Sequence, residues 1–572
     1  MESIFTITDL RLILLAKLCF FAFLACSILL LYKRPKNGLF VLITGVFSGL
    51  AYYFLVKGTV LPFFGLKGDE ITIAAMYQTF THIGMLSDFA YHALPPFYPP
   101  LFFQSFAFLG KLFSWNGVQT AKFASFITIT FFPLLIYYVQ KWFWQSRNST
   151  NSSLSNTVFW TMSSVLFCVA VGWSAVIIKP YELVSAVLTI LWTIGLVYDI
   201  SEKTLTQKRM VWYGIIGGIL FMLFYFWFFL AAIGVTLFHL FSRSRTVITT
   251  YFQYAIIAAI MLLVSAPFWF PLAKSYSHFG SENWQLGFFV IDWIATHGPF
   301  ITSGVVGIIL VLGFVSIIFY RHTTICRALL CLFAAGYVWQ IMGMMTIVLF
   351  SSPLQESKGF LFWNRSILVF GFAYGVQMAW KYAQQRITFV TWKKTACIIG
   401  LCILATQLFF GTFLDDPEVQ KVRVRAQTIR HGVPELIAFL QDSPITKDAS
   451  VLSSGIPELY AFLSLNNTVY FNQHNSHPAA RFSDRLGFVR TLSYQKESRA
   501  LYDILNTSAY KPTRFIFWKG VSEYYPLYFV LDNFPHKMKE MEVLLPRTLF
   551  TAPFFDMVYE NNHFIVYDLR AL

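Results

Sequence analysis

Two adjacent carboxylates, Asp69 and Glu70, follow Gly68 in a polar stretch between two hydrophobic segments of the chain. A carboxylate placed there can act as a general base, because it can take the proton from a hydroxyl whose oxygen attacks a carbon. If that carbon is C1 of a sugar and a phosphate leaves, no second carboxylate is required as an acid. Asp69 also has a structural alternative, because it would be a good N-cap for a helix over 71–80.

Basic groups that could bind a phosphate lie at the ends of other hydrophobic segments. Lys358 and Arg365 lie in or beside a short polar loop, 351–364, and Lys179 stands where two hydrophobic segments meet. Arginine binds phosphate through two parallel hydrogen bonds, and lysine binds it as a point charge. Their structural alternative is to anchor helix ends at the membrane surface. We expect Lys358 and Arg365 to hold a phosphate, with Lys179 as the next candidate.

Three aromatic residues and one acidic residue lie in or beside the polar stretches between hydrophobic segments. Tyr98 precedes two prolines, Tyr181 and Glu182 follow Lys179-Pro180, and Trp284 lies in the loop 273–298. Aromatic rings are common at membrane interfaces, so the rings alone are weak indicators of a site. Glu182 begins a hydrophobic segment, and ionisable groups at membrane depth tend to be functional. We expect these four residues to contact substrate.

Two histidines, His474 and His477, lie in a polar stretch of the C-terminal part, 471–478. Histidines at such a spacing can bind zinc, but no Asp, Glu or Cys lies close to them in the sequence. We therefore expect them to contact substrate, and we expect neither a metal site nor another cofactor. The sequence leaves a requirement for a soluble divalent cation open.

The composition indicates which kind of scaffold must position these residues. Of 572 residues, 56% are hydrophobic and only 12% are charged, whereas soluble proteins carry about 25% charged residues. Many apolar runs are long enough to cross a hydrocarbon core about 30 Å thick. After residue 414, charged residues become frequent and apolar runs shorten to strand length. We predict a polytopic α-helical membrane domain, 1–414, and a C-terminal mixed α/β domain, 415–572.

The apolar runs predict about twelve spans, and a first large outer loop, 58–116, separates the second from the third. The expected spans are 10–32, 38–57, 117–141, 156–176, 182–199, 211–225, 227–242, 250–272, 299–320, 327–350, 365–383 and 394–414. The sixth and seventh spans come from one apolar run with basic residues at both ends, so we expect a turn near 225–229. Within the outer loop, 100–115 predicts an interfacial or re-entrant helix.

The formal net charge of +15 is concentrated in short loops between the expected spans. Basic residues gather at 33–36, 203–209, 243–245, 321–327 and 381–394. This pattern is typical of cytoplasmic loops in membrane proteins, and it argues against nucleic acid as a partner. The loops 58–116, 273–298 and 351–364, together with the C-terminal domain, are then expected on the outer side.

Short sequence patterns predict the elements of the C-terminal domain. Helical spacing covers 424–440 and 495–505, and short apolar runs at 450–452, 515–518, 556–559 and 564–567 predict strands. The last two runs flank a four-residue polar turn, which is typical of a β-hairpin.

The Gly68-Asp69-Glu70 string, followed by Leu-Pro-Pro-Phe-Tyr-Pro-Pro-Leu-Phe-Phe at 94–103, resembles the first outer loop of the galactan arabinofuranosyltransferase A family of mycobacterial cell walls. Residues 179–182 are similar to a later motif of that family. The stretch 472–480, with Arg481, Asp484 and Arg485, resembles its C-terminal domain. The resemblance implies a GT-C fold, a polyprenyl-phosphate arabinofuranose donor and a catalytic acid at Asp69, with Glu70 beside it.

We therefore expect a multi-pass glycosyltransferase of the bacterial plasma membrane, with its site and C-terminal domain facing the periplasm. Its partners would be the lipid donor, a cell-envelope glycan or other acceptor, and membrane lipid. A Phe-, Ile- and Lys-rich composition, unlike that of mycobacterial chains, leaves the acceptor open. One alternative is a transporter or flippase of lipid-linked sugars, which would place charges at the bundle midplane. Another is a non-catalytic glycan-binding membrane protein, which would tolerate loss of Asp69.

Overall fold

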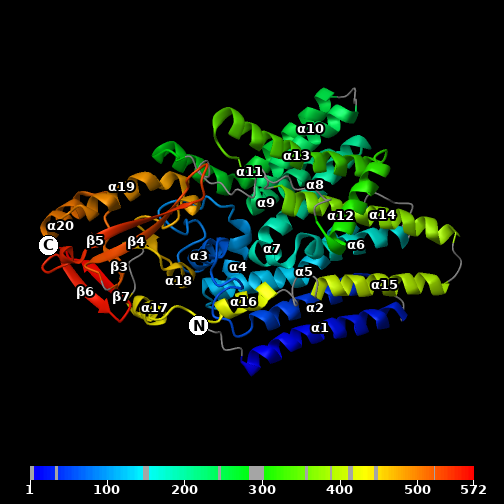
Figure 1. Cartoon of the computed structure of the whole chain (residues 1–572). Helices are drawn as coiled ribbons and strands as arrows, with labels where there is room; N and C mark the ends of the chain where they lie inside the picture. The colour runs from blue at the N-terminus through cyan, green and yellow to red at the C-terminus, as the bar shows by residue number, and fades with distance from the viewer. Residues whose placement is uncertain are drawn as a thin grey trace.

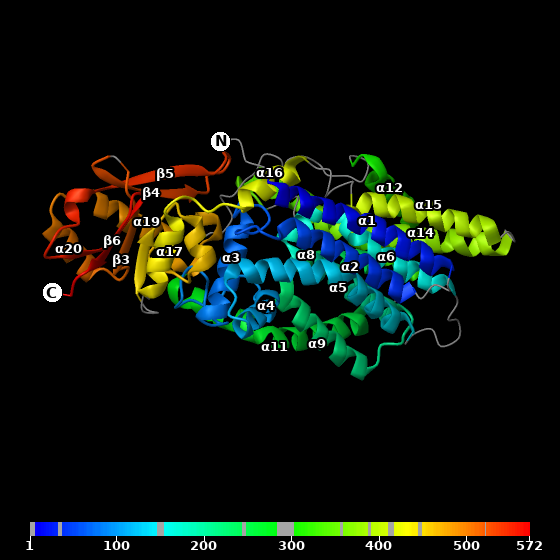
Figure 2. The same cartoon turned by 90° about the horizontal axis from the view of Figure 1, so that it is seen from below.

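A computed structural model describes residues 6–32, 37–145, 154–242, 247–282, 302–354, 359–386, 390–409, 417–443, 449–520 and 522–571. Long helices run side by side through most of the molecule, and a smaller domain with strands lies at one end (Figures 1 and 2). This arrangement confirms the predicted fold class, a helical membrane protein with a C-terminal mixed domain.

Within the described residues, each expected span overlaps a helix or a helix pair. These helices are α1 (Ile7–Tyr32), α2 (Asn37–Val56), α5 (Gly117–Gln145), α6 (Leu154–Val171), α7 (Trp173–Ile178), α8 (Pro180–Ser201), α9 (Gln207–Phe224), α10 (Phe226–Ser242), α11 (Val247–Phe279), α12 (Gly304–Phe319), α13 (Thr324–Phe350), α14 (Arg365–Arg386) and α15 (Val390–Phe409). Within the described part, six helices are long and apolar enough to cross a membrane: α1, α2, α5, α8, α11 and α13. The long apolar run breaks at Tyr225, between α9 and α10, as predicted.

The first outer loop contains two short helices between α2 and α5. They are α3 (Asp69–His82) and α4 (Leu101–Leu112), close to the two helices that the sequence predicts there. Most of α3 is buried, including Ala74 and Tyr77, and α3 packs against α4, α5 and the C-terminal domain. The loop is therefore a packed part of the fold, and its backbone positions are fixed from several sides.

A five-stranded sheet in the order β2-β1-β3-β7-β6 forms the centre of the C-terminal domain. Its strands are β1 (Ser450–Ser453), β2 (Asn466–Asn467), β3 (Arg514–Trp518), β6 (Phe555–Glu560) and β7 (Phe564–Leu569). The predicted hairpin is confirmed, because β6 and β7 pair antiparallel. A separate antiparallel pair, β4 (Tyr524–Leu531) and β5 (Lys539–Pro546), was not expected.

The helices of this domain are α16 (Pro417–Ala426), α17 (Val433–Asp442), α18 (Pro457–Phe462), α19 (Phe482–Ser493) and α20 (Ser498–Thr507). The prediction of one continuous helix over 424–440 is wrong. The chain leaves the helix after Ala426 and re-enters it after Gly432, whose φ of +79° is left-handed. Such a backbone favours glycine and interrupts a right-handed helix. The helix expected over 495–505 is present as α20.

The C-terminal domain contacts the membrane domain at the end of the bundle that carries the first outer loop (Figure 2). Backbone amides of Val60 and Leu61 both donate to the carbonyl of Ala426, each at 2.9 Å. At the end of α11, the amide of Glu282 donates to the carbonyl of Pro478 at 2.9 Å. Two of the loops that the charge pattern assigns to the outer side, 58–116 and 273–298, thus contact the C-terminal domain.

Candidate active site

Asp69 is the first residue of α3, and its carboxylate reaches across to the start of α8. Gly68, with a φ of +59°, occupies the N-cap position, so Asp69 itself is not the cap. Asp69 Oδ2 lies 2.7 Å from Lys179 Nζ, and the Asp69 side chain is 43% exposed. Lys179 immediately precedes Pro180, the first residue of α8. The carboxylate is therefore held in place by an ion pair and still faces solvent.

Lys179 also pairs with the buried Glu182 in the first turn of α8, since its Nζ lies 3.5 Å from Glu182 Oε1. Burial alone would lower the pKa of Lys179, but the carboxylates of Glu182 and Asp69 raise it above its ordinary value. The lysine therefore stays charged between its two carboxylates.

Two tyrosine hydroxyls extend this network into the bundle. The hydroxyl of Tyr98, from the outer loop, lies 3.2 Å from that of Tyr181 in α8. Tyr181 donates in turn to Glu182 Oε1 at 3.4 Å. Five residues that the sequence marked separately, Asp69, Tyr98, Lys179, Tyr181 and Glu182, therefore form one connected polar cluster, which we call the Asp69 cluster.

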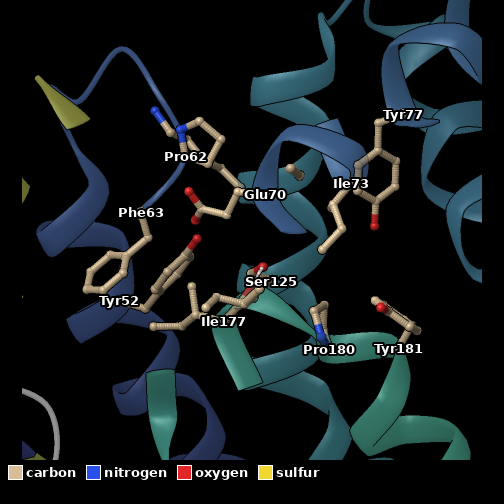
Figure 3. A pocket seen from close by; sticks show the side chains of 13 residues that line it. Tyr52, Pro62, Phe63, Glu70, Ile73, Tyr77, Ser125, Ile177, Pro180 and Tyr181 are labelled. Atoms are coloured by element: carbon tan, nitrogen blue, oxygen red, sulfur yellow. Dashed lines mark hydrogen bonds between the residues drawn. The ribbon is translucent and has the colours of Figure 1, made fainter. Parts of the chain in front are cut away.

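Glu70 points away from the Asp69 cluster and is only 4% exposed. Its Oε1 accepts from the amide of Phe64 at 2.9 Å, and its Oε2 accepts from the amide of Leu66 at 3.1 Å. In Figure 3 its carboxylate points toward the Tyr52 hydroxyl, inside a small pocket. Burial raises the pKa of Glu70 to about 7, although these backbone hydrogen bonds oppose the rise. Its contacts fit a role in holding the 62–70 segment.

Glu70→Gln is expected to remove a pH dependence of stability. The pKa of this carboxyl rises from 4.5 to about 7 on folding, so the folded state binds the extra proton between these values. The contribution of Glu70 to stability should therefore fall as the pH rises from about 4.5 to about 7. Glutamine does not titrate, so the unfolding midpoint of the variant should vary less with pH across this window.

This expectation is checked by thermal unfolding of the purified chain at several pH values from 4.5 to 7.5. Glu497→Gln, at an exposed site ahead of α20, is the matched control and should leave the wild-type pH dependence intact. Equal slopes for Glu70→Gln and wild type would show that folding does not raise the pKa of Glu70.

Sequence reasoning missed three polar neighbours of Glu70. Tyr52 of α2, and Lys122 and Ser125 of α5, line the same pocket. Lys122 Nζ donates to the carbonyl of Thr59 at 2.7 Å, which ties α5 to the start of the outer loop. A signal for Lys122 was present, because a lysine inside an expected span is uncommon and tends to mark a structured polar site.

The hydrogen bond that Arg365 makes in the described part of the chain joins it to α6 and not to the Asp69 cluster. Arg365 begins α14 directly after a π-helical turn, Phe360–Asn364. Its Nη1 donates to the carbonyl of Ala170 at 3.1 Å, near the end of α6. From there the chain runs through α7 to Lys179. Lys358 and Trp284, the other expected contacts from the outer loops, fall outside the described residues.

His474 and His477 of the C-terminal domain both have partners within the protein. His477 is 1% exposed; its Nδ1 accepts from the amide of Ala479 at 3.0 Å, so its Nε2 donates to the carbonyl of Pro95 at 2.9 Å. Burial lowers the pKa of His477 to about 4, so the ring is neutral. His474 Nδ1 lies 4.0 Å from Asp532 Oδ2. The contacts of His477 fit a role in positioning the segment that leads to Tyr98.

Comparisons with known proteins find likeness at the level of three-dimensional structure. No protein-family model and no curated protein matches the chain. The solved structures that resemble it include ArnT from Cupriavidus metallidurans bound to undecaprenyl phosphate, with a TM-score of 0.47, 12% identity, and coverage of 92% of this chain and 97% of that one.

Two further similar structures are larger proteins. The archaeal oligosaccharyltransferase AglB from Archaeoglobus fulgidus, in complex with an inhibitory peptide and a dolichol-phosphate, has a TM-score of 0.42 and 11% identity, over 83% of this chain and 69% of that one. The arabinofuranosyltransferase AftD from Mycobacteria has a TM-score of 0.44 and 10% identity, over 93% of this chain and 40% of that one. The likeness in all three cases concerns the overall fold.

Proposed function

We propose that this chain is a membrane glycosyltransferase that moves a pentose, arabinofuranose, from a polyprenyl-phosphate donor to a cell-envelope glycan or another acceptor outside the cytoplasm. The observation that carries the proposal is the position of Asp69. Its carboxylate is 43% exposed and lies 2.7 Å from a lysine, at the point where the outer loop meets the start of α8. An accessible carboxylate beside a cation provides both a base and a positive charge for a phosphate.

In the proposed reaction, Asp69 takes the proton from an acceptor hydroxyl while that oxygen forms a bond to C1 of the sugar. The bond between C1 and the phosphate oxygen breaks, and its electron pair stays on the phosphate. A positive charge near this oxygen stabilises the developing negative charge. We assign this role to Lys358 and Arg365, the two cations expected first from the sequence, and to Lys179.

The remaining residues of the Asp69 cluster are proposed to contact the sugar or the acceptor. The hydroxyls of Tyr98 and Tyr181 can each donate and accept hydrogen bonds, and Glu182 can accept them. Trp284 and His474 are retained as proposed contacts of the substrate. Glu70 is proposed to position Asp69, because it fixes the segment that precedes α3 through the amides of Phe64 and Leu66. The choice of arabinofuranose follows from the resemblance of the 68–70 and 94–103 strings.

The test is transfer from synthetic polyprenyl-phosphate sugars in membranes that contain the chain. We expect radiolabel to move from polyprenyl-phosphate arabinofuranose to a membrane glycan or lipid, and no label to move from a sugar nucleotide. Transfer of another sugar in its place would change the proposed donor. Membranes that contain the folded chain but transfer no sugar from any polyprenyl phosphate would contradict the proposed function.

Arg365→Ala is expected to raise the apparent KM for the lipid donor by about tenfold to a hundredfold, because a charge-assisted hydrogen bond contributes about 1.5–3 kcal/mol. The kcat should change less, since the phosphate is bound in the ground state as well. Arg365→Lys should restore part of the affinity, because lysine keeps the charge but lacks the second hydrogen bond.

Arg321→Ala, at an exposed position after α12, is the matched control and should leave the donor KM unchanged. If Arg365→Ala also leaves it unchanged, Arg365 serves only to hold the end of α6 through Ala170, and the phosphate is bound elsewhere.

We also propose that the C-terminal domain and the Asp69 cluster face the periplasm of a bacterial plasma membrane. The basic loops at the ends of the expected spans support this orientation. Lys496→Cys, in the C-terminal domain, should react with a membrane-impermeant maleimide in spheroplasts, whereas Lys208→Cys, at the start of α9, should react only after permeabilisation. Both positions are exposed. The opposite labelling pattern, in a chain without its native cysteines, would reverse the orientation.

A further inference from the structure

A second cavity opens between the end of α11 and the outer-loop segment 86–95. Its volume is about 340 Å³, compared with about 20 Å³ for the pocket at Glu70. It is lined by Leu86, His92, Ala93, Leu94, Pro95, Pro271, Lys274, Ser275, His278 and Phe279. None of these residues belongs to the Asp69 cluster, so this α11 cleft is a separate feature of the molecule.

The polar lining of the α11 cleft is suited to an anion. Lys274, His92 and His278 supply basic side chains, and no carboxylate is among the described residues that line the cleft. Ser275 also lines it, is only 6% exposed, and its hydroxyl has no hydrogen-bond partner within the described part of the chain. A buried hydroxyl without a partner is costly, and a phosphate oxygen would accept its hydrogen bond.

The apolar lining and the location of the cleft indicate that the anion is part of a lipid. Only 17% of the residues in the most apolar stretch of α11 are buried. Leu263 and Phe270 of this helix are 74% and 61% exposed, and Phe279, at its end, lines the cleft. Large apolar side chains in such numbers on the outside of a spanning helix face lipid. The cleft therefore lies where a lipid headgroup meets the end of a lipid-facing helix.

We propose that the α11 cleft binds the phosphate headgroup of an anionic membrane lipid. Lys274 and the hydroxyl of Ser275 would bind the phosphate oxygens, His92 and His278 would donate further hydrogen bonds, and the acyl chains would follow the exposed side of α11. This site is distinct from the Asp69 cluster, and it does not depend on the reaction proposed for that cluster.

The experiment measures lipid binding to the purified full chain by native mass spectrometry. The probes are phosphatidic acid, phosphatidylcholine and inorganic phosphate. We expect phosphatidic acid to bind more tightly than phosphatidylcholine. Replacing Lys274 by Gln should weaken the binding of phosphatidic acid about fivefold, which is the usual effect of one basic residue near an anionic membrane surface. Ser275→Ala, which changes no charge, should weaken the same binding about twofold to tenfold, because one hydrogen bond is lost.

Lys111→Gln is the matched control, because this exposed lysine lies at the end of α4 and does not line the cleft. An equal loss of affinity in this variant would show only a general effect of charge and would overturn the proposal. Equal weakening of phosphatidylcholine by Lys274→Gln would also overturn it, because the headgroup charge would then not be recognised. Displacement of phosphatidic acid by inorganic phosphate at equal concentration would identify a site for free phosphate in place of a lipid site.

Discussion

Asp69→Asn should fold and insert like the wild-type chain but transfer sugar about 10²–10⁴-fold more slowly, which is the usual contribution of a general base. Asparagine keeps the size of the side chain and can still accept a hydrogen bond from Lys179. It cannot take a proton from an acceptor hydroxyl. The structural cost should be small, because the Asp69 side chain is 43% exposed and ion pairs in contact with solvent contribute little to stability.

Initial rates with the polyprenyl-phosphate donor, at matched expression and matched unfolding midpoint, measure this effect. Asp484→Asn is the control, because Asp484 is also half-exposed and also pairs with a neighbouring cation, Arg481, but lies on α19 of the C-terminal domain. It should retain wild-type transfer. Transfer by Asp69→Asn at the wild-type rate would show that Asp69 is not the base, and the proposed mechanism would be wrong.

Asp9→Ala should lower the free energy of unfolding by about 3–5 kcal/mol, the usual cost of removing one partner from a buried ion pair. The carboxylate of Asp9, near the start of α1, pairs with the guanidinium of Arg423 in α16, and the side chains are 7% and 3% exposed. Arg423 also donates to the carbonyl of Leu55 at 3.0 Å, so it cannot turn to solvent easily. Without Asp9 its charge would stay buried.

Two measurements test this loss of stability: the thermal unfolding midpoint of the purified chain, and the rate at which a protease cuts the 427–432 connection between α16 and α17. Both should show loss of stability in Asp9→Ala. The double variant Asp9→Ala with Arg423→Leu should recover much of it, because replacing both charges by apolar groups is often neutral. Wild-type stability of Asp9→Ala would show that Arg423 is adequately held by Leu55 and its other carbonyl partners.

The positions of the spanning helices could be predicted because each apolar run is a local property of the sequence. A helix that crosses lipid needs about 20 apolar residues, and the runs at α2, α5 and α8 meet that requirement directly. The β6–β7 hairpin could also be predicted, since a polar turn between two apolar runs indicates that the two strands pair. The candidate site residues could be marked by residue type, and the structure brings five of them together as the Asp69 cluster.

Features that depend on contacts between distant segments could not be predicted. Asp69 and Glu70 are adjacent in sequence, yet one faces Lys179 and the other accepts from Phe64 and Leu66. Which carboxylate is buried depends on how the 62–70 segment folds over α3, and no local pattern encodes that. The pair of Asp9 with Arg423 joins residues that are 414 positions apart in the sequence. The break before Gly432 was missed because apolar spacing continues on both sides of it.

The hydrogen bonds between the outer loop and the C-terminal domain make the two parts one cooperative unit. The carbonyl of Ala90 accepts from the amide of Asn467 at 2.9 Å, and the Tyr91 hydroxyl accepts from the amide of Tyr470 at 2.9 Å. A chain truncated before α16 would expose these groups, together with the carbonyl of Pro95. The loop that carries Tyr98 would then lose its partners. Deleting the domain therefore cannot show whether it binds glycan, because the same deletion releases the loop beside the Asp69 cluster.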